Sequence, residues 1–142
     1  MASDEMHLTE ALFPWRGIHH IALATPDLDQ TRQFYGDVLG MSMGDISPSH
    51  DGRGRHCLVF VKPGDPETWG LHFFERPNAA GTGATEAPIL HIAFRLPDDA
   101  SAQALRERLH THGVAITEIP ELGSFIFWDN HGLMLEVTVP KP

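Results

Sequence analysis

The sequence predicts an α+β fold built from two β-α-β-β-β modules, because one phrase occurs twice in the chain. His20–Asp27 has the sequence HIALATPD and His91–Asp98 has the sequence HIAFRLPD, and each copy is followed by a helix-like segment and then by strand-like runs. The copies lie about half of the 142 residues apart, which is too long a period for a solenoid and indicates a duplicated supersecondary unit. A chain of this length makes one ordinary domain, so the two copies must share one core.

The first module begins with a half-buried strand at 18–24. Apolar and small residues alternate there, so that His20 shares a face with Ala22 and Ala24 while larger apolar side chains take the other face. The small side chains leave room beside the histidine. Residues 1–16 precede this strand without clean periodicity, and we expect them to form an N-terminal arm.

A helix and three further strands complete the first module, which we place at 17–76. Asp27 is a typical helix N-cap, and Gly40 follows the last apolar residue of the helical stripe. Clusters of Gly, Pro and Asp separate the strand-like runs that follow. We expect these strands near 41–47, 56–62 and 69–75.

The second module, at 89–140, repeats this order after a linker at 77–88 that is rich in small residues and proline. Its helix is expected to end at Gly113. The predicted elements are a strand at 89–96, a helix near 99–112 and strands near 114–118, 123–128 and 133–139. We treat 17–142 as a single domain.

The composition limits the partners. Ten Lys and Arg against 19 Asp and Glu give a formal net charge of −9, which disfavours binding to nucleic acid and to anionic membranes. The one cysteine, Cys57, lies in an apolar run and is expected to be a buried thiol. There is no apolar segment typical of an export signal or a membrane span, so we expect a cytoplasmic protein.

Four side chains are candidate metal ligands. Glu136 lies in an otherwise apolar strand, on the face opposite the apolar side chains, and a buried carboxylate there needs a partner. His72 has the equivalent position in the last strand of the first module, and His20 and His91 begin the two repeated phrases. Imidazole nitrogens with one carboxylate suit Zn, Ni, Co, Mn or Fe better than Ca or Mg. We therefore expect a divalent transition metal as the cofactor.

Two further residues are candidates for binding a substrate. Arg95 falls on the same face as His91 and could hold a carboxylate or phosphate, although a pairing with a surface acid is an equal alternative. Phe74 is a candidate for an apolar wall. His19, by strand alternation, is expected to face away from His20.

These residues resemble the vicinal oxygen chelate superfamily, which includes glyoxalases, bleomycin resistance proteins and extradiol dioxygenases. The matching stretches are His19–Leu28, Phe34–Gly40, His91–Phe94 and Asp129–Glu136. The resemblance implies paired modules whose curved mixed sheets form a cup around a metal, with helices on the outer face and a homodimer interface that often completes each cup. It also implies metal ligands at His20, His91 and Glu136, with His72 at a variable fourth position.

The resemblance leaves the reaction open, because this superfamily keeps its metal cup while changing the chemistry. We expect a metal-dependent enzyme whose small oxygenated substrate is chelated through vicinal oxygens, with proton transfer of the isomerase, epimerase or lyase type and with Glu136 as the catalytic residue. An alternative is an extradiol-type ring-cleaving dioxygenase that uses Fe(II) and needs only two histidines and one carboxylate. A second alternative is a non-catalytic drug-binding resistance protein.

Overall fold

The first module of the chain contains one interrupted helix and several strands. These are β1 (His20–Thr25), α1 (Leu28–Arg32), the π-helical turn η2 (Gln33–Val38), β2 (Ser42–Met43), β3 (Ser47–Pro48), β4 (Arg55–Phe60) and β5 (Gly70–Glu75). The second module contains β6 (His91–Arg95), α2 (Asp99–Thr111), β7 (Thr117–Ile119), β8 (Ser124–Trp128) and β9 (Met134–Thr138). The order of elements predicted from the repeat is therefore confirmed.

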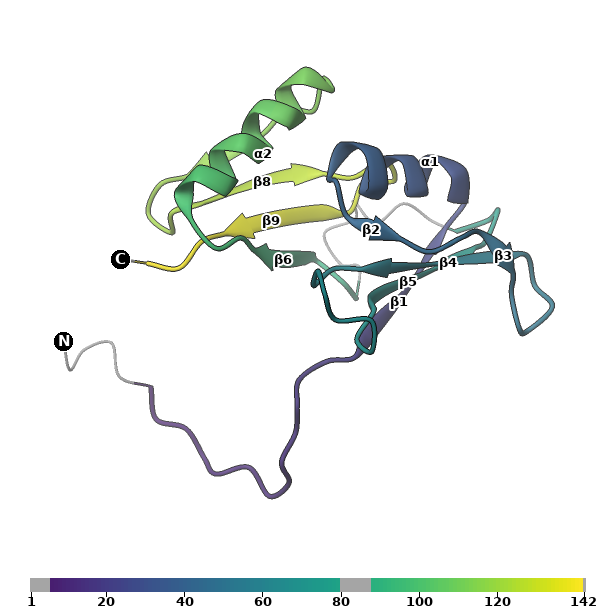
Figure 1. The fold of residues 1–142 in the computed structure, drawn as a ribbon, viewed down its shortest axis with the longest axis horizontal. Helices are drawn as coiled ribbons and strands as arrows, with labels where there is room; N and C mark the ends of the chain where they lie inside the picture. Colours follow the sequence, from purple (N-terminus) through teal and green to yellow (C-terminus); the bar gives the residue numbers. More distant parts are fainter. Residues whose placement is uncertain (1–5, 80–87, 142) are drawn as a thin grey trace.

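In a computed structural model of the chain, which describes residues 6–79 and 88–141, the strands form two mixed sheets (Figure 1). One has the order β1-β5-β4-β2, with β3 also paired to β4, and the other has the order β6-β9-β8-β7. In each sheet the first strand of the module lies parallel to the last strand, and the other pairs are antiparallel. The α+β class and the duplication are confirmed, but within one chain the two sheets do not close into one cup.

The helices lie together on one side of the sheets, as Figure 1 shows, and the core lies between them and the strands. Residues from both modules enter one apolar cluster, in which the rings of Phe34 and Phe127 are 6.4 Å apart. Polar contacts join the modules as well: the hydroxyl of Tyr35 donates to Asp129 at 2.7 Å, and Arg108 donates to the carbonyls of Asp37 and Val38. The shared core that the chain length demanded is present.

The strand predicted at 41–47 is two short strands, β2 and β3. Ser42 and Met43 pair with Phe60 and Val59, and pairing resumes only at Ser47 with His56. Three residues, 44–46, thus face the two residues 57 and 58, which is the one-residue excess of a β-bulge.

The predicted helix is present but changes its winding halfway. Leu39 N–H bonds to the carbonyl of Phe34, five residues earlier, at 2.9 Å, which is a π-helical spacing. In this wider turn the consecutive residues Phe34 and Tyr35 are both buried. Burial of two neighbouring rings against the sheet accompanies the departure from α-helical geometry.

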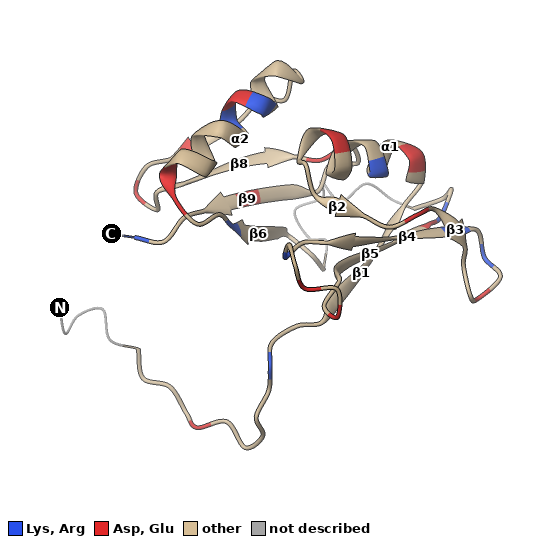
Figure 2. Cartoon of the chain, in the orientation of Figure 1, with Lys and Arg blue, Asp and Glu red and all other residues tan. Residues whose placement is uncertain are grey.

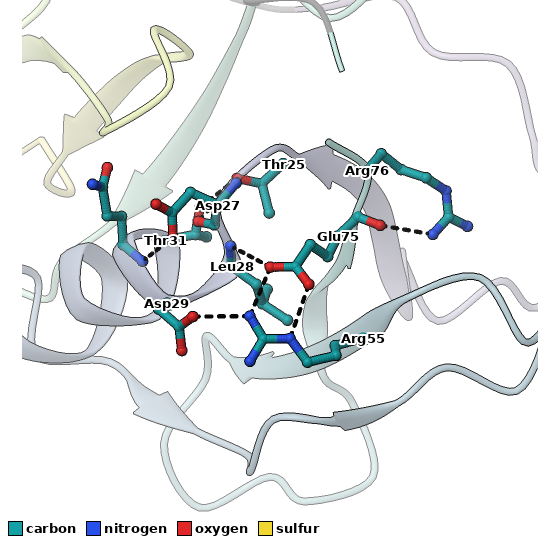
Figure 3. A network of polar contacts seen from close by, with 9 residues as sticks. Thr25, Asp27, Leu28, Asp29, Thr31, Arg55, Glu75 and Arg76 are labelled. Atoms are coloured by element: carbon teal, nitrogen blue, oxygen red, sulfur yellow. Dashed lines mark hydrogen bonds and ion pairs between the residues drawn. The ribbon is translucent and has the colours of Figure 1, made fainter. Parts of the chain in front are cut away.

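A polar network fixes the beginning of α1 over the ends of β1 and β5 (Figure 3). The carboxylate of Glu75 accepts from Leu28 N at 3.2 Å and from Arg55 at 2.8 and 2.7 Å, and Arg55 also donates to Asp29 at 2.8 Å. The Arg55 hydrogen bonds, followed by the one from Leu28 N, lower the pKa of Glu75. Asp27 caps the helix by accepting from Gln30 N, as predicted.

The segments outside the modules are described only in part. Residues 6–19 precede β1 without a helix or strand, and several of their large apolar side chains are exposed, among them Leu12 and Trp15. The predicted linker 77–88 falls largely on residues 80–87, which lie outside the described residues. The domain boundaries therefore stay predictions. Within the described ranges, no helix is long and apolar enough to cross a membrane.

Candidate metal-binding site

The open face of the first sheet, on the side away from the helices, carries two of the predicted ligands. Alternation along β1 buries Leu23 and leaves His20 and Ala22 exposed. Because Ala22 pairs with His72 on β5, His20 and His72 are diagonal neighbours, and their ring centroids are 5.9 Å apart. Trp69, which precedes β5, packs against both rings at 4.7 and 5.7 Å.

The second sheet carries the other two ligands in the same register. Ala93 on β6 pairs with Glu136 on β9, so His91 and Glu136 are diagonal neighbours, and His91 Nε2 lies 3.3 Å from Glu136 Oε1. The second carboxylate oxygen, Oε2, accepts a hydrogen bond from the hydroxyl of Ser124 at 2.7 Å. Glu136 thus has the partners that a largely buried carboxylate requires.

One chain brings the four predicted ligands together only as two pairs. His20 lies beside His72, and His91 lies beside Glu136, but the pairs belong to separate sheets. Within residues 6–79 and 88–141, no group of three or more His, Cys, Asp or Glu side chains could hold a metal ion. The assignment of the four residues to one metal site stays a prediction.

Glu136 is one of the few charged residues that lie in the strands. Figure 2 shows that most charged residues of the described chain lie on helices and loops, while the strands are mostly uncharged.

Burial, followed by the charges of His56, His20 and His50, lowers the pKa of His72. A neutral imidazole is the form that coordinates a metal ion.

The candidate substrate-binding residues lie in different surroundings. The ring of Phe74 lies 4.1 Å from that of His72, so it lines the same open face. Arg95 is exposed and makes no ion pair with any carboxylate in the described part of the chain. It borders a largely apolar cavity of about 400 Å³ between the modules, which is also lined by Phe60, Leu105 and Phe127.

Three residues beside the predicted ligands were not found from the sequence. His56 Nδ1 lies 2.7 Å from His72 Nε2, Ser124 binds Glu136, and Trp69 packs on both module-one histidines. The expectation that His19 faces away from His20 is wrong, since their Nδ1 atoms are 2.8 Å apart. β1 begins only at His20, so strand alternation does not govern His19.

Comparisons with known proteins agree with this architecture. A model of the "Glyoxalase/Bleomycin resistance protein/Dioxygenase superfamily" matches residues 17–137. The chain is 27% identical over 132 residues to a Bacillus subtilis (strain 168) protein named "Putative ring-cleaving dioxygenase MhqA", a match that covers 88% of this chain and 40% of that protein's length.

Solved structures share the fold. A glyoxylase/bleomycin resistance protein/dioxygenase domain from Frankia sp. EAN1pec is similar with a TM-score of 0.73 and 22% identity, over 89% of this chain and 99% of that one. A trypanothione-dependent glyoxalase I from Leishmania major is similar with a TM-score of 0.68 and 21% identity, over 88% and 87%. On the family match, which spans both modules, the chain belongs to the glyoxalase/bleomycin resistance protein/dioxygenase superfamily.

Proposed function

We propose that this protein is a metal-dependent enzyme whose small oxygenated substrate binds through vicinal oxygens, and that His20, His72, His91 and Glu136 hold the metal. The observation that carries the proposal is the repeated register. His72 stands diagonal to His20, and Glu136 stands diagonal to His91, at equivalent positions of the two sheets. A duplication that keeps a pair of metal-binding side chains on each open face is expected if the two pairs act together.

We propose that each complete site is formed by two copies of the chain. β1 and β6 are the edge strands of their sheets, and each carries one of the ligands, His20 or His91. Unpaired strand edges are favourable sites for association with another chain. If β1 of one copy lies beside β6 of another, the pair His20 and His72 meets the pair His91 and Glu136, so a symmetric homodimer contains two sites.

The donor set fits a first-row transition metal. It offers three imidazoles, one of which, His72, has a pKa lowered by burial, and one carboxylate, a combination that suits Zn, Ni, Co, Mn or Fe. A divalent metal bound there would supply Lewis-acid polarisation of the substrate oxygens.

Glu136 is the candidate proton-transfer residue. Ser124 holds one carboxylate oxygen by a hydrogen bond, while the other oxygen lies toward His91 on the open face. From there Glu136 would take a proton from a carbon beside a substrate carbonyl and return it to a neighbouring atom. Phe74 would supply an apolar contact to the substrate, and Arg95, which has no carboxylate partner in the described chain, would bind an anionic substituent.

Ring cleavage of a dihydroxylated aromatic substrate is the second candidate. The observation that favours it is the similarity to the Bacillus subtilis protein named "Putative ring-cleaving dioxygenase MhqA". This reaction needs only His20, His91 and Glu136 as ligands to Fe(II), the two-histidine, one-carboxylate arrangement of non-haem iron oxygenases. His72 would then lie beside the iron without ligating it.

Metal analysis with oxygen uptake separates the candidates. Protein purified without oxygen and without an affinity tag is analysed by mass spectrometry, reconstituted with each candidate metal, and assayed for oxygen consumption with catechols and hydroquinones. Stoichiometric Zn, Ni, Co or Mn without oxygen uptake supports proton transfer, and iron with oxygen uptake supports ring cleavage. If the wild type takes up no metal, or takes up no more metal than a His20→Ala variant, the proposal is wrong. His110→Ala, on the exposed side of α2, is the control and should bind as much metal as the wild type.

A further inference from the structure

Each proposed ligand on a last strand has a hydrogen-bond partner on the strand before it, at the same place in both modules. On β4 and β5, Leu58 pairs with His72, and His56, two residues before Leu58, contacts His72. On β8 and β9, Ile126 pairs with Glu136, and Ser124, two residues before Ile126, contacts Glu136. The duplication therefore repeats the partner as well as the ligand.

The contact in the first module continues beyond His56. His56 Nδ1 lies 2.7 Å from His72 Nε2, and His56 Nε2 lies 3.1 Å from the hydroxyl of Ser47, its direct pair on β3. His72 is buried, whereas Ser47 is exposed. A chain of hydrogen bonds thus leads from the proposed ligand to the surface of the sheet.

A chain of two neutral imidazoles can carry its protons in only two ways. In one, His56 Nδ1–H donates to His72 Nε2, so that His72 carries its own proton on Nδ1 and both of its nitrogens are engaged. In the other, His72 Nε2–H donates to His56 Nδ1, His56 Nε2–H donates to Ser47, and His72 Nδ1 keeps a free lone pair. Only the second arrangement leaves His72 able to bind a metal.

We infer that His56 is a positioning residue for His72, equivalent to Ser124 for Glu136: it accepts the Nε2 proton of His72 and thereby presents the Nδ1 lone pair to a divalent transition metal. The inference rests on the proposed function for the metal ion that His72 would bind, whereas the hydrogen bond between His56 and His72 is independent of that function. Metal-binding histidines nearly always donate their second ring N–H to an acceptor, most often a carboxylate, a backbone carbonyl or water, and loss of that acceptor weakens metal binding about 10- to 100-fold. The lone pair of His56 Nδ1 would play the same part here.

The first test uses the metal-free wild-type protein. Long-range ¹H–¹⁵N correlation spectra of the histidine rings distinguish a ring protonated on Nε2 from one protonated on Nδ1. We expect the Nε2–H tautomer for both His72 and His56, and His56→Leu should mix the tautomers of His72. A predominant Nδ1–H tautomer of His72 in the wild type would overturn the inference, whether or not the protein binds metal.

The second test measures the metal dissociation constant by competition with a chelator. We expect His56→Leu to weaken Zn²⁺ or Co²⁺ binding about 10- to 100-fold and His56→Asn, whose amide oxygen can accept the same proton, to restore most of the loss. His110→Leu is the matched control, because His110 lies on the exposed side of α2, away from both rings. Unchanged affinity in His56→Leu would contradict the inference, as would an equal loss in His110→Leu.

The two tests distinguish failure of this inference from failure of the proposed metal-dependent function. If the wild type binds no metal, the proposed function fails, while the tautomer of His72 still decides the role of His56. If His56→Leu does not fold, the wild-type spectrum and the His56→Asn variant still decide it.

Discussion

At the scale of single residues, the carboxylate of Glu136 has a different neighbour at each oxygen. Ser124 donates to Oε2, and His91 lies beside Oε1. Its side chain is 14% exposed, so it is held in place while one side remains open. This combination suits a carboxylate that is proposed both to bind a metal ion and to transfer a proton.

Glu136→Gln should abolish turnover and leave the fold intact, because the amide is nearly isosteric but is neither a base nor an anionic ligand. The measurements are kcat on the substrate found by screening and the thermal midpoint. Glu118→Gln, on an exposed carboxylate paired with Arg106, is the matched control and should keep full activity. Full activity in Glu136→Gln would remove this residue from the mechanism.

Sequence alternation was sufficient to place the four proposed ligands on one face of their strands and insufficient to find the side chains that contact them. His20, His72, His91 and Glu136 follow from the period of two along each strand. His56 contacts His72, and Ser124 contacts Glu136, diagonally across two strands, and both contacts depend on the pairing register. Register also depends on turn geometry and on bulges, which the alternating pattern of one strand does not show.

At the scale of elements, the repeated Pro-Asp ending of each phrase begins a helix. Asp27 accepts from Gln30 N at 3.0 Å, and Asp98 accepts from Ser101 N at 2.8 Å. The hydrogen bond from Ser101 N is the main cause of a lowered pKa at Asp98. The phrase thus has a proposed metal ligand at its first position and a helix cap at its last.

Asp98→Ala should lower the thermal midpoint at neutral pH, since α2 loses its cap. A carboxyl whose folded pKa is lowered stabilises above its unfolded pKa and stops doing so as the pH falls through the folded value. The difference in thermal midpoint between the wild type and Asp98→Ala should therefore close in acid. Asp98→Asn, whose side chain can still cap the helix, should have a thermal midpoint near that of the wild type at neutral pH. A pH-independent gap would show that the carboxylate charge plays no part.

Two element-level details were beyond sequence reasoning. The bulge at 44–46 and the π-helical turn η2 both depend on contacts between elements: Arg32 donates to the carbonyl of Gly44 at 3.1 Å, and η2 buries Phe34 and Tyr35 together. Propensity describes a segment by itself, and here tertiary contacts decide its form.

At the scale of the whole molecule, Tyr35 connects the modules. It is fully buried, and its hydroxyl donates to Asp129, whose other oxygen accepts from the backbone of His131 and Leu133. Burial first, and the Asp129 charge next, raise the pKa of Tyr35 well above its ordinary value. One hydroxyl therefore ties the first module to a turn of the second.

Tyr35→Phe should lower the free energy of unfolding by about 1 to 3 kcal/mol, because the part-buried carboxylate of Asp129 loses the hydroxyl that donates to it. A phenol with a raised folded pKa stabilises fully below the unfolded pKa, about 10, and this contribution is lost as the pH rises above it. The difference in the free energy of unfolding between the wild type and Tyr35→Phe, measured by urea denaturation, should thus narrow at alkaline pH. Equal stability at neutral pH would mean that the contact does not hold the modules together.

The central claim, that two copies build each metal site, is tested most directly by complementation. A variant lacking the first pair, His20→Ala with His72→Ala, is co-expressed with one lacking the second, His91→Ala with Glu136→Ala, and the mixed dimer is purified through two different tags. We predict that neither double variant alone binds metal and that the mixed dimer binds one ion, because one of its two sites combines both intact pairs. A mixed dimer that binds no metal, beside a wild type that does, would contradict the claim.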